Sequence, residues 1–121
     1  MGNLVQFGMF RLLAATAMVV IVTLPAAAAD CVQPGAVPVI PDGATATVDQ
    51  MKAAHVAVQS YVNGLQALQD CDEAKIKMAP KGTKAEELQK LRDEGNAAID
   101  QAQALQTTYS AQVKAFKARP Q

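Results

Sequence analysis

The sequence predicts an all-α protein, an antiparallel two-helix hairpin with a proline-rich N-terminal extended arm tied to helix one by a disulfide. Three observations support this fold class. Residues 47–79 and 83–119 both have apolar side chains spaced by three and four, which places them on one face of a helix. Only residues 80–82 separate the two segments, so the helices must be antiparallel neighbours, as in a short coiled coil. One cysteine lies in the arm and one in the first helical segment.

Residues 1–29 have the features of a secretory signal peptide. Leu12 to Leu24 is a predominantly apolar run of thirteen residues, shorter than the roughly 20 that a membrane-spanning helix needs. An arginine precedes this run, and a proline and four alanines follow it. Cleavage after Ala28 and cleavage after Ala29 both fit the small-residue rule. The sequence therefore predicts a periplasmic or secreted protein with no stable membrane insertion after cleavage.

Length and composition limit the number of domains and the kinds of partner that the chain can have. A chain of 121 residues forms one domain at most, and Met1 and Met9 both fit as its start. Eleven basic and eleven acidic residues give a formal charge of zero, so nothing in the total charge favours a nucleic-acid partner. A domain this small buries a modest fraction of its surface and usually needs a staple.

The arm, residues 30–46, precedes the first helix. Its prolines at positions 34, 38 and 41 block helix and favour extended geometry. Sixteen steps from Cys31 to Thr47 reach about 50 Å, whereas a helix from Thr47 to Cys71 is about 36 Å long. The arm can therefore run back along the helix, and we predict a Cys31–Cys71 disulfide. The apolar side chains expected to pack on the way are Val32, Val37, Val39 and Ile40.

The first helix, residues 47–79, begins at a capping box in which Thr47 and Gln50 exchange hydrogen bonds. Pro80 ends it. Its apolar stripe consists of Met51, Ala54, Val58, Tyr61, Val62, Leu65 and Leu68.

A second capping box, Thr83 with Glu86, predicts the start of the second helix, residues 83–119, and Pro120 ends it. Its stripe consists of Leu88, Leu91, Gly95, Ala98, Ile99, Ala102, Leu105, Tyr109, Gln112, Val113 and Phe116. The side chain of Leu65 or Tyr61 from the first helix is expected to pack against Gly95. The cations near the end of this helix, Lys114, Lys117 and Arg119, offset its dipole.

Residues typical of catalysis or metal binding are few. His55 is the only histidine, and Met51 one turn before it makes a pair too small for a metal site. We expect His55 to be half-buried beside the seam between the helices. The carboxylates around Cys71, namely Asp70, Asp72 and Glu73, are expected on a solvated face. The sequence therefore predicts no enzyme, no cofactor and no metal.

The order of features resembles a group of small exported proteins of Gram-negative bacteria. The shared features are a signal peptide, two cysteines, the arm segment PVIPDGATAT from Pro38 to Thr47, and the helical segment YSAQVK from Tyr109 to Lys114. The group has no established function, cofactor or functional residues. The resemblance implies export and a helical hairpin.

Two hypotheses for function follow. The first is a non-enzymatic hairpin that binds an envelope protein or component, or associates weakly with itself, through a surface centred on Tyr109, Val113 and Phe116. That surface is expected because the apolar stripes are wider than a single seam can cover. The alternative is a small-ligand or metal-responsive periplasmic protein that uses His55.

Overall fold

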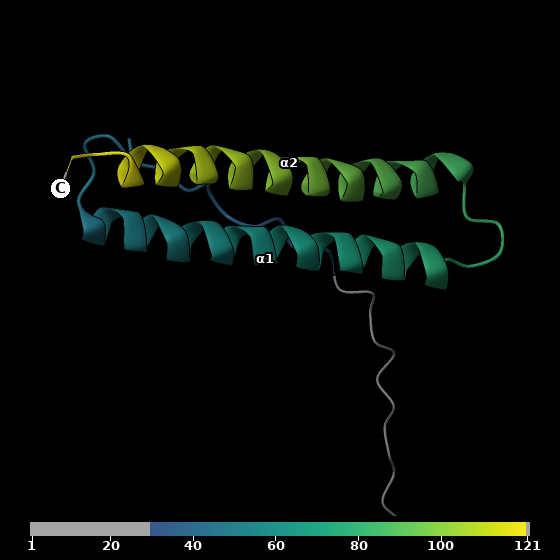
Figure 1. Cartoon of the computed structure of the whole chain (residues 1–121). Helices are drawn as coiled ribbons and strands as arrows, with labels where there is room; N and C mark the ends of the chain where they lie inside the picture. Colours follow the sequence, from purple (N-terminus) through teal and green to yellow (C-terminus); the bar gives the residue numbers. More distant parts are fainter. Residues whose placement is uncertain (1–29, 121) are drawn as a thin grey trace, which may run out of the picture.

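A computed structural model describes residues 30–120, so the predicted signal peptide lies outside the described residues. Two long helices, α1 (Val48–Met78) and α2 (Ala85–Lys117), lie side by side and antiparallel (Figure 1). The predicted all-α hairpin is confirmed. The helix ends fall within two residues of the predicted ranges.

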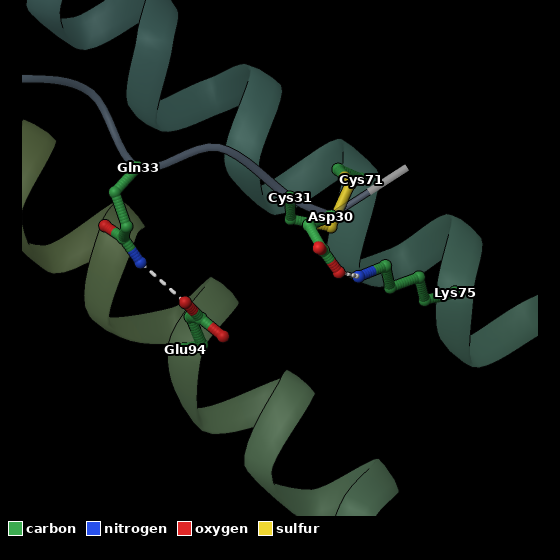
Figure 2. Close-up of a disulfide and its surroundings, with 6 residues drawn as sticks. All are labelled: Asp30, Cys31, Gln33, Cys71, Lys75 and Glu94. Atoms are coloured by element: carbon green, nitrogen blue, oxygen red, sulfur yellow. Dashed lines mark hydrogen bonds and ion pairs between the residues drawn. A yellow bond between two sulfur atoms is a disulfide. The ribbon is translucent and has the colours of Figure 1, made fainter. Parts of the chain in front are cut away.

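The arm forms a third layer that lies across both helices. At its start, Cys31 is bonded to Cys71 of α1, with a distance of 5.6 Å between the Cα atoms (Figure 2). Gln33 Nε2 donates a hydrogen bond to Glu94 Oε1 of α2 at 2.5 Å. Asp30 forms an exposed ion pair of 3.8 Å with Lys75. The predicted disulfide is therefore confirmed, and the arm contacts α2 as well as α1.

The side chains by which the arm packs differ from the expectation. Val32 and Val39 are 80% and 88% exposed, and Val37 is exposed as well. Ile40 and the prolines at positions 34, 38 and 41 are half-buried instead. Pro34 lies so close to Gly64 of α1 that a Cβ added there would be 2.9 Å from the proline Cβ. An extended segment turns only some of its side chains toward one surface. In this arm the prolines face the helices and the valines face the solvent.

The two predicted capping boxes have different outcomes. Thr47 Oγ1 accepts from the Gln50 N–H at 3.2 Å, and Gln50 Oε1 accepts from the Thr47 N–H at 2.8 Å, which confirms the first box. The second box is wrong. Thr83 Oγ1 donates to the Pro80 carbonyl at 2.8 Å, so its hydroxyl closes the turn, and α2 begins after Lys84 without a side-chain cap.

The core lies in the seam between the helices and consists of the predicted stripes. Its centre is Leu65 and Leu68 of α1 against Ala98 of α2. The half-buried residues packed against that centre are Cys31, Tyr61 and Ala102, and the seam is extended by Met51, Ala54, Val58 and Leu105.

The residues that pack against Gly95 differ from those predicted. The atoms closest to an added Cβ there belong to Gln69 and Asp72, at 3.7 and 4.0 Å, and not to Leu65 or Tyr61. Leu65 packs against Ala98, one turn further along α2. The register between two antiparallel helices depends on the turn that joins them and on side-chain fit, which neither stripe specifies.

Candidate interaction surface at the open end of the hairpin

The three residues predicted as an interaction surface, Tyr109, Val113 and Phe116, lie on the last turns of α2. All three are half-buried, because this part of α2 passes beside the first turns of α1. The Tyr109 hydroxyl donates to the Met51 carbonyl of α1 at 3.4 Å. The surface is therefore shared by both helices at the open end of the hairpin, away from the 79–84 turn.

A shallow groove of about 500 Å³ lies between the helices at this end. We call it the open-end groove, and its lining residues are Val48, Met51, Lys52, His55, Val56, Tyr109, Val113 and Phe116. Val48 and Val56 are 53% and 67% exposed. No arm residue lines the groove, because the arm crosses the hairpin on the side of Gly64 and Glu94. This side of the seam is left open.

His55 lies at the edge of the open-end groove. Its ring is tilted against the Tyr109 ring, with 5.7 Å between centroids. The side chain is exposed, not half-buried as predicted, because the buried face of α1 runs through Met51 and Ala54 and His55 lies beside that face. Within residues 30–120, no group of three or more His, Cys, Asp or Glu side chains is arranged to hold a metal ion.

Arg119 joins the end of α2 to the segment before α1. Its Nη1 donates to the Ala46 carbonyl at 2.7 Å, and its Nε donates to the Phe116 carbonyl at 3.3 Å. The guanidinium lies 4.0 Å from the centroid of the Phe116 ring. Sequence reasoning assigned Arg119 only to the helix dipole. Its role depends on Ala46, which is 73 residues away along the chain, so no local pattern could reveal it.

Comparisons of this chain with protein-family models, with curated proteins and with solved structures found no match. In the described part of the chain, neither helix has the apolar length of a membrane span.

Asp72, expected on a solvated face, is in fact buried against α2. The residue is 1% exposed, and neither carboxylate oxygen has a hydrogen-bond partner among the described residues. It lies opposite Gly95 of α2, with its Cβ 4.0 Å from the position that a Cβ at Gly95 would take. The apolar stripe predicted for the first helix ends at Leu68 and does not include Asp72, although Asp72 is more deeply buried than the adjacent Cys71.

Burial raises the pKa of the Asp72 carboxyl above its ordinary value of 3.8. The charge of Glu94 raises this pKa further, and Lys75 lowers it in part. The folded chain therefore binds this proton more tightly than the unfolded chain does. Ionised Asp72 therefore lowers the free energy of unfolding at neutral pH. As the pH falls through the raised pKa, the carboxyl becomes protonated in the folded chain and this destabilisation decreases. Below 3.8 it is absent, because the carboxyl is then protonated in the unfolded chain as well.

Asp72→Asn is accordingly expected to raise the free energy of unfolding at pH 7, by on the order of 1 kcal/mol, because it removes a buried charge without changing the shape of the side chain. The advantage over wild type should shrink with falling pH and vanish below 3.8. Thermal melts of both proteins across this pH range measure it. Asp70→Asn, at an exposed neighbouring position, is the matched control at pH 7. A variant less stable than wild type at pH 7 would contradict the prediction.

Proposed function

We propose that this chain is a small exported helical-hairpin protein that binds an envelope protein or component through the open-end groove. The observation that supports this most directly is the groove itself, where two largely exposed valines stand beside a half-buried aromatic residue. Apolar surface covered by a partner contributes about 25 cal/mol per Å², from which the entropy cost of association is subtracted. A partner that covered this face would gain affinity without any change in the hairpin.

The lining of the groove favours binding over catalysis. Its ionisable side chains are Lys52, His55 and Tyr109, and the remaining lining residues are apolar. General acid–base catalysis of hydrolysis uses a base close to a nucleophile or a pair of carboxylates, and the lining contains neither arrangement. We therefore propose a role without an enzymatic reaction.

Export is the second part of the proposal. The predicted signal peptide supports it, and so does the Cys31–Cys71 disulfide, because disulfides persist in oxidising compartments such as the periplasm. A metal- or ligand-responsive role for His55 stays as the alternative. Calorimetric metal titration would favour that alternative if it showed micromolar binding that His55→Ala abolished.

Val113→Lys should abolish docking on the groove, because it places a charge among Val48, Val56 and Phe116 at a position whose partial exposure lets the lysine reach water. The measurements are sedimentation velocity of the exported protein and affinity capture from envelope extract. Wild type should self-associate weakly at high concentration or retain a specific component, and the variant should lose both properties.

The matched control for Val113→Lys is Val39→Lys, which adds the same charge to an exposed valine of the arm outside the groove. This control should behave as wild type. A wild type that stays strictly monomeric and captures nothing that Val113→Lys loses would refute the proposed surface.

The proposed export is tested at the N-terminus. Mass spectrometry of the exported protein should show an N-terminus at Asp30 or Ala29.

A further inference from the structure

The open-end groove combines apolar walls with a cationic edge. Its body consists of Val48, Met51, Val56, Val113 and Phe116, and no carboxylate lines it. Lys52 is its one charged lining residue, and His55 stands beside it. Among residues 30–120, Lys52 takes part in no ion pair. An anion at this edge would therefore meet an unpaired cation.

Positively charged side chains outnumber the carboxylates of Asp42 and Asp49 at this end of the hairpin. From residue 101 to the end, the sequence contains Lys114, Lys117 and Arg119 and no aspartate or glutamate. The first four turns of α1 contain a single carboxylate, Asp49, which is not among the lining residues. The open end of this neutral chain is therefore locally basic, which favours an anionic group on whatever binds there.

The extent of the groove favours a compact ligand over a docked helix. A volume of about 500 Å³ lies within the range of small-molecule sites, roughly 300–1,000 Å³. A docked helix would need apolar contacts continuing over several turns along the seam. Beyond His55 and Tyr109 the next hollow has a mixed lining, in which Val58 and Val62 stand among the polar side chains of Gln59, Asn63, Gln106 and Ser110. The continuous apolar surface thus ends after about two helical turns of α1.

We propose that the open-end groove binds a monomeric fatty-acid-like molecule, with its alkyl chain against the valines and Phe116 and its carboxylate at Lys52. This inference rests on the proposed binding function and names the class of component that the groove takes. Met51 at the floor suits such a ligand, because a flexible thioether side chain adapts to the shape of an alkyl chain.

The test is isothermal titration of the exported, oxidised protein with three probes that share a twelve-carbon chain, all kept below the concentrations at which they aggregate. Dodecanoate should bind. Dodecanol, which lacks the charge, should bind about threefold to tenfold more weakly, and dodecyltrimethylammonium should bind more weakly still. Equal affinity for dodecanoate and dodecanol would refute the role of the cationic edge.

Two matched pairs of variants locate the site. Val56→Asp should weaken dodecanoate binding about tenfold or more, whereas Val39→Asp, at another exposed valine outside the groove, should leave it unchanged. Lys52→Glu should weaken dodecanoate about fivefold to tenfold without weakening dodecanol, and Lys90→Glu, on the exposed face of α2, should change neither. Equal effects within either pair would place the ligand elsewhere and refute the inference.

The inference and the proposed function fail in different ways. If no dodecanoate binds while Val113→Lys still removes self-association or a captured component, this inference is refuted and the proposed function stands. If dodecanoate does not bind and Val113→Lys removes nothing, both are refuted. Dodecanoate binding that Val56→Asp and Lys52→Glu weaken selectively supports both.

Discussion

The double variant Cys31→Ser/Cys71→Ser is expected to melt roughly 15–30 °C below wild type while keeping its helix content at low temperature. The disulfide closes a loop with a sequence separation of 40 residues. Chain entropy assigns such a loop about 4 kcal/mol of stabilisation, and in a domain of this size each kcal/mol corresponds to about 4–8 °C in melting temperature. The bond packs against the edge of the core, whose centre, Leu65 and Leu68 against Ala98, joins α1 to α2 without it, so both helices should still pair when cold.

Circular dichroism melts of the oxidised protein, the double variant and the reduced wild type measure this prediction. The reduced wild type serves as the control, because it lacks the bond but keeps both sulfur atoms, and it should melt near the double variant. Near Cys31 the remaining polar contact of the arm with α2, from Gln33 to Glu94, is exposed and contributes little. A melting temperature within a few degrees of wild type for both would mean that the disulfide adds little to stability.

Gly43→Ala is expected to destabilise the fold by about 1–3 kcal/mol, because the added methyl group would overlap the backbone of α2. A Cβ at this position would lie 2.8 Å from the Gln112 carbonyl carbon and 2.9 Å from the Phe116 nitrogen, and it would overlap the Gln112 carbonyl oxygen. The Gly43 N–H also donates to Gln112 Oε1 at 2.8 Å. Backbone atoms of a helix cannot move aside cheaply, so the arm must lift and weaken that bond.

Gly35→Ala is the matched control for Gly43→Ala, since it makes the same change in the same arm. No atom lies within 4 Å of a Cβ added at Gly35, and its φ is not positive. This control should match wild type or exceed it by up to about 1 kcal/mol, because alanine restricts the unfolded chain. Chemical denaturation of the three proteins compares them. Equal midpoints for Gly43→Ala and wild type would contradict the close approach of arm and helix.

The features that could be predicted from the sequence are those that depend on local pattern or on reach. Spacings of three and four fixed which residues of each helix face the seam, and all the predicted stripe residues are buried or half-buried. The Thr47–Gln50 capping box needs only two side chains three residues apart. The disulfide followed from the length of the arm, since the arm is long enough to join Cys31 to Cys71 and the sequence contains no other cysteine.

The candidate site was predicted in part. Tyr109, Val113 and Phe116 were expected to form a surface because their stripe is too wide for one seam, and they do lie together at the open-end groove. The α1 half of the groove was not predicted as its other wall. The register between the helices decides which turns of α1 face which turns of α2. The spacing of apolar residues along each helix does not specify this register, so the second wall could not be predicted.

The sequence by itself determined the two helices, the sides that they bury and the bond that anchors the arm, because each of these follows from spacing along one segment. Only the tertiary structure decided which side of the arm packs on the helices, that Asp72 is buried opposite Gly95, and which side of the seam remains open. The physical reason is that these features depend on the relative placement of three segments. The turn, the close approach of Gly43 to α2 and the bond from Arg119 to Ala46 set that placement together.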